Sequence, residues 1–242
     1  DKVTCRMADR IVVLSDDMKR SLIERKKSFG DKIICINNFA LDSGGRVKCP
    51  SRVVKRTDKS CLNIVYAGNL GRFQRLDFFL EVFSKLRHRT DIKLTLVGDG
   101  TERKALIDGA ARGGLNIQIL DNQSLTALAD LLAEADFGLV SLRPNVYRYA
   151  YPSKISHYIA AGLPLLALVE ESSEIAQMIN VRGIGYVISD DVLSCSIFLQ
   201  TLADDHPSIA PFARNCFSAY DELFSDSLFK ERWKELLEGV SP

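Results

Sequence analysis

The stretch Tyr151-Pro-Ser-Lys-Ile-Ser-His-Tyr-Ile-Ala-Ala-Gly-Leu-Pro164 predicts a short helix that leads into a buried strand. Ser153 is a favourable N-cap, Gly162 fits the residue just past a helix end, and Pro164 prevents continuation of the helix. The apolar run Leu165-Leu-Ala-Leu-Val169 follows and predicts a buried strand. This pair of elements is typical of a chain in which helices and strands alternate.

Lys154 is the unusual residue of this stretch. A lysine in the first turn lies at the positive end of the helix dipole, which is unfavourable by a few tenths to about 1 kcal/mol. An anion held by both Lys154 and the free N–H groups of the helix start would remove the conflict. The alternative is a solvated lysine whose ammonium bends away, and the stretch alone leaves both interpretations open.

Composition is that of an ordinary globular protein: 242 residues, 46% hydrophobic, 26% charged, net charge +1. Basic residues are dispersed, which argues against a nucleic-acid partner. No apolar run is long enough for a transmembrane segment, and we expect a cytoplasmic protein. The six cysteines include no Cys-x-x-Cys pair and there are three histidines, so the spacing predicts no metal site.

Strands and helices alternate regularly after residue 61, which predicts an α/β fold with a doubly wound, mainly parallel sheet of the Rossmann-like type. The predicted strands are 62–67, 92–97, 116–120, 137–141, 164–169 and 185–188. The predicted helices are 73–87, 101–111 with Thr101 as its cap, 124–135 with Ser124 as its cap, the opening helix, 172–180 with Ser172 or Ser173 as its cap, 190–203, 208–222 and 226–238.

The first 60 residues follow a different pattern. Residues 9–15 read as a strand ending in a helix cap, 16–29 as a helix and 32–37 as a strand, after which periodicity is lost. We expect 1–40 to be the end of a preceding domain with its crossover, 41–60 a linker, 61–225 the main domain and 226–242 a terminal helix. The chain begins in mid-pattern at Asp1, so we expect a fragment of a longer protein.

Polar and glycine-rich segments follow the predicted strands at their carboxyl ends, where parallel sheets bind ligands. Together they predict a site for a phosphorylated ligand, although each glycine pair alone is more typical of a tight turn than of a phosphate site. A dinucleotide fingerprint would need glycine where Arg103 stands, and no Walker A sequence is present. The residues concerned are Gly68, Gly71, Gly98, Gly100, Asp121 and the cations Arg72, Arg75 and Lys154.

Two further residues have competing interpretations. His157 follows Lys154 by three positions and therefore shares its flank of the helix; it is either a packing residue or a catalytic one. Glu174 at a helix start is either a dipole partner or a carboxylate that accepts hydrogen bonds from sugar hydroxyls.

Taken together, these stretches resemble the C-terminal, donor-binding half of the GT-B fold glycosyltransferases of family 4. The likeness covers almost the whole chain. It rests on Tyr66-Ala-Gly-Asn-Leu-Gly71 with Gln74, Leu96-Val-Gly-Asp-Gly100, Pro152-Ser-Lys154 and Ala160-Ala-Gly-Leu-Pro164 in this order. The variant that carries Pro-Ser-Lys is frequent in enzymes that build surface polysaccharides.

The resemblance implies a donor site for a nucleoside diphosphate sugar, without cofactor or metal. Lys154 would stabilise charge on the departing phosphate, and Glu174 would contact the ribose or a donor hydroxyl. The remaining implied donor-binding residues are Gly68, Asn69, Gly71, Arg72, Gln74, Gly98, Gly100, Leu120 and Asp121 beside the base, Pro152 and Ser153. Many family members have two glutamates eight positions apart, whereas this chain has Tyr149 and His157 there.

The implied activity is transfer of a sugar, with UDP expected rather than GDP, to a glycan or lipid-linked acceptor, with retention of configuration. The missing N-terminal domain would be a partner of this chain, and a peripheral place on the inner face of the membrane would come through that domain. The chain alone would bind nucleotide without turnover. The alternatives are a nucleotide-sugar epimerase of similar build and a non-catalytic nucleotide-binding scaffold.

Overall fold

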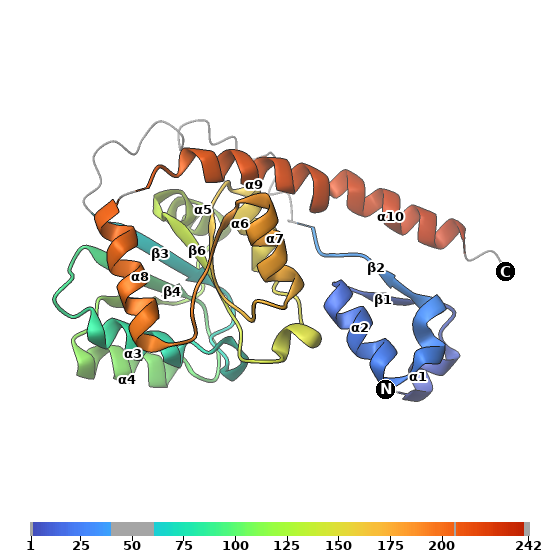
Figure 1. The fold of residues 1–242 in the computed structure, drawn as a ribbon, viewed down its shortest axis with the longest axis horizontal. Helices are drawn as coiled ribbons and strands as arrows, with labels where there is room; N and C mark the ends of the chain where they lie inside the picture. The colour runs from blue at the N-terminus through green and yellow to red at the C-terminus, as the bar shows by residue number, and fades with distance from the viewer. Residues whose placement is uncertain (1, 40–60, 206, 240–242) are drawn as a thin grey trace.

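The computed structural model describes residues 2–39, 61–205 and 207–239, so the expected linker 41–60 lies outside the described residues. Six parallel strands form the main sheet in the order β5-β4-β3-β6-β7-β8 (Figure 1). They are β3 (Leu62–Ala67), β4 (Ile92–Val97), β5 (Ile117–Leu120), β6 (Phe137–Ser141), β7 (Leu165–Leu168) and β8 (Gly185–Val187). The predicted doubly wound α/β fold is confirmed. The chain reverses its direction of progress across the sheet between β3 and β6, where such folds bind ligands.

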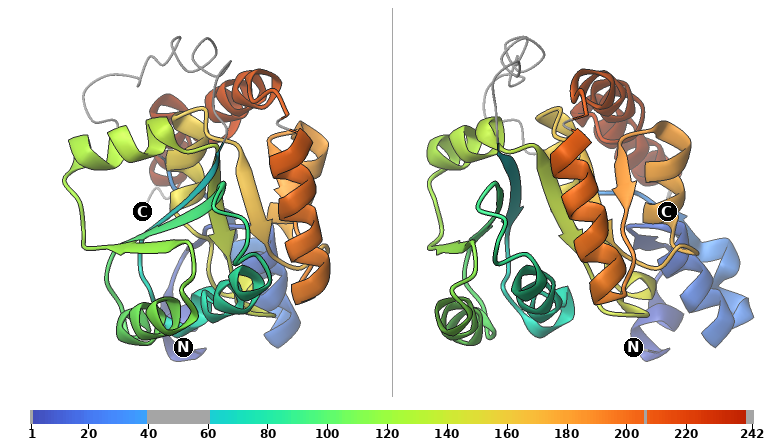
Figure 2. Two further views of the ribbon diagram at one scale, coloured as in Figure 1. Left: turned by 90° about the vertical axis from the view of Figure 1, so that its left-hand side faces the viewer. Right: turned by 60° about the vertical axis from the view of Figure 1, so that its left-hand side comes forward.

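Helices cover both faces of this sheet (Figure 2). Buried side chains of α3 (Asp77–Lys85), α4 (Arg103–Gly113) and α8 (Val192–Asp205) form one core layer. Those of α5 (Leu125–Glu134), α6 (Lys154–Ala160), α7 (Glu174–Arg182) and α9 (Ala210–Leu223) form the other. Along β3, Ile64 and Tyr66 face the first layer and Val65 the second. Burial on both faces explains why the strands are almost continuously apolar.

The N-terminal segment forms a small unit of its own beside the main sheet (Figure 1). It contains α1 (Lys2–Met7), β1 (Ile11–Val13), α2 (Asp16–Arg25), the 3₁₀ helix η1 (Lys27–Lys32) and β2 (Ile33–Cys35). β1 and β2 pair in parallel, and Val13, Phe29 and Ile33 form their core. The helix predicted for 16–29 therefore ends early, because the chain becomes extended at Lys26 and η1 turns Phe29 into this core.

Three predicted helix caps are confirmed: the hydroxyls of Ser15, Ser124 and Ser173 each accept a hydrogen bond from the backbone N–H three residues later. Three other predicted helix starts need correction. Thr101 and Ser153 do not cap their helices: α4 begins after Glu102 and Ser153 already has helical dihedral angles, so no side-chain cap bond forms. The helix predicted from residue 73 begins as the 3₁₀ turn η2 (Arg72–Gln74), and left-handed Arg75 separates it from α3.

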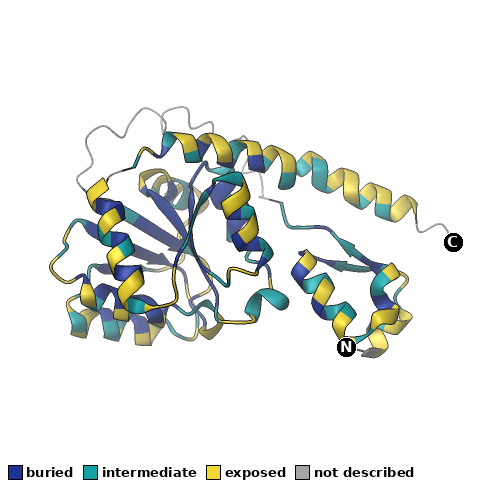
Figure 3. Ribbon diagram, in the orientation of Figure 1, coloured by how far each residue is buried: buried dark blue, intermediate teal, exposed yellow. Residues whose placement is uncertain are grey.

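The terminal helix α10 (Asp226–Glu238) extends from the main sheet toward the N-terminal unit and contains no buried residue (Figures 1 and 3). Its Phe229 ring lies 4.4 Å from that of Phe39. Over the described ranges, no helix has the length and apolar character that crossing a membrane requires.

Candidate functional site

A cavity of about 560 Å³ lies at the carboxyl ends of β3 and β6. Its walls come from the turn after β3, the start of α5, the end of β6 and the segment that leads into α6. Seven of the predicted site residues line it: Gly68, Asn69, Gln74, Pro152, Ser153, Lys154 and His157. The opening stretch of the sequence thus contributes one wall, and the glycine turn after β3 contributes the facing part.

Lys154 is the central charged residue of this cavity. Its Nζ lies 3.2 Å from the centroid of the Tyr66 ring, and a Cβ placed on Gly68 would be 3.3 Å from the same atom. Desolvation lowers the pKa of Lys154 well below its usual value, while the ring contact favours the charged form. Among the described residues no carboxylate pairs with this ammonium. A polyanion in the cavity would supply the missing counter-charge.

Two buried tyrosines form the floor beneath Lys154. The Tyr66 hydroxyl donates to the carbonyl oxygen of Asn69 (2.7 Å), and the Ala67 N–H donates to the Tyr158 hydroxyl (2.8 Å). Both rings are fully buried, and burial raises the pKa of both hydroxyls. Gly138 of β6 makes room for Tyr158, because a Cβ there would lie 2.5 Å from a ring carbon. The floor is therefore fixed by packing and hydrogen bonds at the same time.

The glycines after β4 support the turn after β3 from behind. Gly98 and Gly100 have φ values of 140° and 158°. A Cβ on Gly98 would lie 2.0 Å from the Gly68 carbonyl oxygen, and one on Gly100 would lie 2.5 Å from that of Leu70. Neither glycine lines the cavity, so close backbone approach between the two turns accounts for both.

Ser141 was missed by the sequence analysis. It ends β6, is 2% exposed and lines the cavity, yet its Oγ has no hydrogen-bond partner within the described part of the chain. Gln74 Oε1 is also buried without a partner there. Buried polar atoms are normally satisfied, so these two are suited to a ligand. The available signal was a hydroxyl residue closing an otherwise apolar strand.

The other end of the cavity is less polar. Leu125, Leu128 and Leu132 of α5 line it together with Asn122 and Gln123 from the preceding loop. Apolar side chains beside a few amides suit a flat heteroaromatic ring with polar edges. The cavity thus has a cationic end and an apolar end.

His157 lines the cavity one turn after Lys154, as its spacing predicted. Its Nδ1 lies 3.0 Å from the Ser153 carbonyl oxygen. Because a carbonyl only accepts, this contact assigns the proton to Nδ1 and leaves Nε2 of the neutral ring as an acceptor. Tyr149 does not line the cavity and points instead toward α2, where the Arg25 guanidinium lies 4.9 Å from its ring centroid.

Several predicted site residues lie outside the cavity: Gly71, Arg72, Gly98, Gly100, Leu120, Asp121 and Glu174. Arg75, expected to converge with Lys154, pairs instead with Asp190 (3.6 Å) and lies over the Phe78 ring. Asp121 pairs with Arg103 at 2.6 Å. Of the three cations expected at this edge, Lys154 alone lines the cavity.

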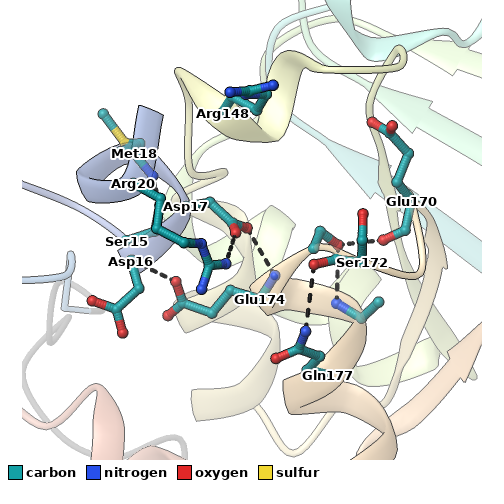
Figure 4. A network of polar contacts seen from close by, with 12 residues as sticks. Ser15, Asp16, Asp17, Met18, Arg20, Arg148, Glu170, Ser172, Glu174 and Gln177 are labelled. Carbon is teal, nitrogen blue, oxygen red and sulfur yellow. Dashed lines mark hydrogen bonds and ion pairs between the residues drawn. The ribbon is translucent and has the colours of Figure 1, made fainter. Parts of the chain in front are cut away.

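Glu174 lies at the contact with the N-terminal unit (Figure 4). Its carboxylate accepts the Asp16 N–H at 2.6 Å, and burial raises its pKa. Its own N–H donates to the Asp17 carboxylate at 2.8 Å. The structure thus directs Glu174 toward α2.

A family model described as glycosyl transferases group 1 matches residues 61–197. The probable glycosyltransferase WbjE of Pseudomonas aeruginosa is 29% identical over 197 residues, covering 74% of this chain and 45% of WbjE. WcaI of Escherichia coli strain K12, a proposed colanic acid biosynthesis glycosyl transferase, is 32% identical over 152 residues, covering 61% of this chain and 37% of WcaI. The chain thus spans less than half the length of these relatives.

Solved structures share the fold. Anabaena Alr3699/HepE in complex with UDP and glucose superposes with a TM-score of 0.79 at 15% identity, covering 99% of this chain and 65% of that one. WaaG, a glycosyltransferase involved in lipopolysaccharide biosynthesis, gives a TM-score of 0.70 at 18% identity, covering 92% of this chain and 61% of WaaG. At these identities the likeness establishes the fold alone.

Proposed function

Because the chain belongs to the group 1 glycosyl transferases, we propose that it binds a nucleoside diphosphate sugar as donor, in the cavity between β3 and β6. The observation that carries this proposal is the ammonium of Lys154, desolvated and without a carboxylate partner among the described residues, beside the Gly68 turn. The diphosphate would lie at this cationic end and the base against the leucines of α5. Lys154 would then stabilise negative charge on the departing diphosphate.

UDP is the proposed nucleotide, a choice supported by the structural neighbour that holds UDP and glucose. The acceptor would be a glycan or a lipid-linked saccharide of a surface polysaccharide, which the colanic acid assignment of WcaI supports. We expect transfer with retention of configuration. The family membership favours transfer over the epimerase alternative.

The roles proposed for Gly68, Asn69, Gln74, Ser153 and Lys154 are compatible with their places in the cavity wall. The ribose contact proposed for Glu174 would be made by a carboxylate that already accepts the Asp16 N–H at one of its oxygens.

Isothermal calorimetry with UDP, GDP and uridine tests the proposal. We expect UDP to bind more tightly than GDP and much more tightly than uridine. Absence of binding by either diphosphate at millimolar concentration would contradict it. A non-catalytic scaffold would bind UDP equally well. Transfer from a UDP sugar, assayed in a protein that includes the proposed N-terminal domain, distinguishes the two, because a scaffold would show no transfer.

A further inference from the structure

The segment between β6 and α6 separates the cavity from α2. It contains the 3₁₀ turn η3 (Val146–Arg148). Val146, Ala150 and Tyr151 line the cavity, whereas Arg148 and Tyr149 point toward α2. Residues on the two sides of this wall therefore face different surroundings: the cavity on one side and the N-terminal unit on the other.

The C-terminal end of α2 holds the outer side of this wall. Arg148 forms a hydrogen-bonded ion pair with Glu24, and the Arg25 guanidinium lies 4.9 Å from the centroid of the Tyr149 ring. Hydrogen bonding to Arg25, with a smaller contribution from Ser21, lowers the pKa of the Tyr149 hydroxyl. Tyr149 thus contacts α2 through both its ring and its hydroxyl.

The N-terminal end of the same helix is fixed to α7. Asp17 accepts the Glu174 N–H and Glu174 accepts the Asp16 N–H, so each carboxylate satisfies the free N–H of the other helix (Figure 4). Asp17 is 5% exposed and also pairs with Arg20. Anchored at both ends, α2 is held against the main domain and can in turn hold η3.

We propose that α2 supports the η3 wall of the donor cavity, so that Glu24 and Arg25 are positioning residues for nucleotide binding although neither lines the cavity. This inference rests on the proposed function. If the contact is lost, Val146, Ala150 and Tyr151 are no longer held in one arrangement, and part of the binding free energy is spent on ordering them. Nucleotide affinity therefore depends on the N-terminal unit.

The substitution Glu24→Gln tests this inference, with Glu222→Gln as a matched control. Both glutamates are exposed members of an ion pair between two elements, with side-chain exposures of 62% for Glu24 and 54% for Glu222. Their arginine partners, Arg148 and Arg182, are 33% and 30% exposed. The Glu222 pair joins α7 to α9, and neither of its residues lines the cavity.

We expect Glu24→Gln to weaken UDP binding about two- to fivefold, because the free energy that an exposed ion pair contributes corresponds to a factor of this size. Glu222→Gln should leave UDP binding unchanged. The two variants should have similar melting temperatures, which separates positioning from general stability. The charge-reversed double variant Glu24→Arg with Arg148→Glu should recover most of the affinity. Equal UDP affinity of Glu24→Gln and Glu222→Gln would overturn the inference. Failure of the unmodified chain to bind UDP would contradict the proposed function, and the inference with it.

Discussion

At the scale of the residue, Lys154 combines a cationic side chain, a desolvated position and, among the described residues, no carboxylate partner. Its lowered pKa means that the free protein holds this proton less tightly than an exposed lysine does. A diphosphate beside the ammonium would raise the pKa again. Binding of UDP and uptake of a proton are therefore expected to be linked.

This linkage predicts how UDP affinity depends on pH. Affinity should be highest below the pKa of free Lys154 and should fall as pH rises through it, because the charged form is then lost. Calorimetry in buffers of different ionisation enthalpy should detect proton uptake in that range. Lys154→Met should bind UDP weakly with no such dependence. Proton release, or the same dependence in Lys154→Met, would contradict the linkage.

Ser141 gives a second prediction at this scale. Ser141→Ala removes a buried hydroxyl that has no described partner, so the free energy of unfolding should stay within about 1 kcal/mol of the original value. A hydroxyl that donates to a phosphate contributes roughly 1.5 kcal/mol or more, so UDP affinity should fall at least about tenfold. Denaturant unfolding and calorimetry measure the two effects. Unchanged UDP affinity would exclude Ser141 from the site.

The place of Lys154 in the cavity wall was predicted because a cation in the first turn of a helix is electrostatically unfavourable. Arg72 and Arg75 were also expected at a helix start, but this argument does not specify the direction of a long side chain. Arg75 pairs with Asp190, more than a hundred positions away in the sequence. Ser141 was not predicted, because the burial of its Oγ without a described hydrogen-bond partner is a property of the folded structure.

At the scale of the element, β6 and α6 meet at Gly138, where the ring of Tyr158 takes the place of a side chain. Gly138→Ala should displace this ring and weaken the Ala67–Tyr158 hydrogen bond that closes the cavity floor. We expect a loss of about 1–3 kcal/mol in the free energy of unfolding, measured in denaturant, as for other overpacked cores.

Gly30→Ala is the control for this loss. The nearest atom to a Cβ there would be 3.9 Å away, so the free energy of unfolding should change by no more than about 0.5 kcal/mol. Similar losses in both variants would show that the effect does not come from the contact with Tyr158.

The six strands of the main sheet were predicted almost to the residue, because burial on both faces of a parallel sheet demands an unbroken apolar run. The two N-terminal strands are shorter than the predicted 9–15 and 32–37. Helix starts were less predictable: Ser15, Ser124 and Ser173 cap as expected, but Ser153 does not. The mutual capping of α2 and α7 joins residues 158 positions apart, and no local pattern encodes such a pairing.

At the scale of the whole molecule, the N-terminal unit and α10 lie together at one side of the main sheet (Figure 1). Their contact includes the rings of Phe39 and Phe229. The family match ends at residue 197, and the chain covers 45% of WbjE. The division into 1–40, 41–60, 61–225 and 226–242 remains a prediction.

If this division holds, the chain alone binds UDP but does not transfer a sugar. The chain alone should bind UDP but release no measurable UDP from a UDP sugar in the presence of a saccharide acceptor, because the expected N-terminal domain would supply most of the acceptor site. A coupled assay for UDP release measures this. Sustained, acceptor-dependent turnover by the chain alone would contradict the prediction.

The most direct test of the central claim is a calorimetric comparison of Lys154→Ala with the unmodified chain, using UDP and uridine. Loss of a charge-assisted contact of roughly 1.5–3 kcal/mol should weaken UDP binding about ten- to a hundredfold. Uridine, which lacks the diphosphate, should bind both proteins equally. Loss of the same factor for both ligands, or of neither, would contradict the assignment of Lys154 to the diphosphate.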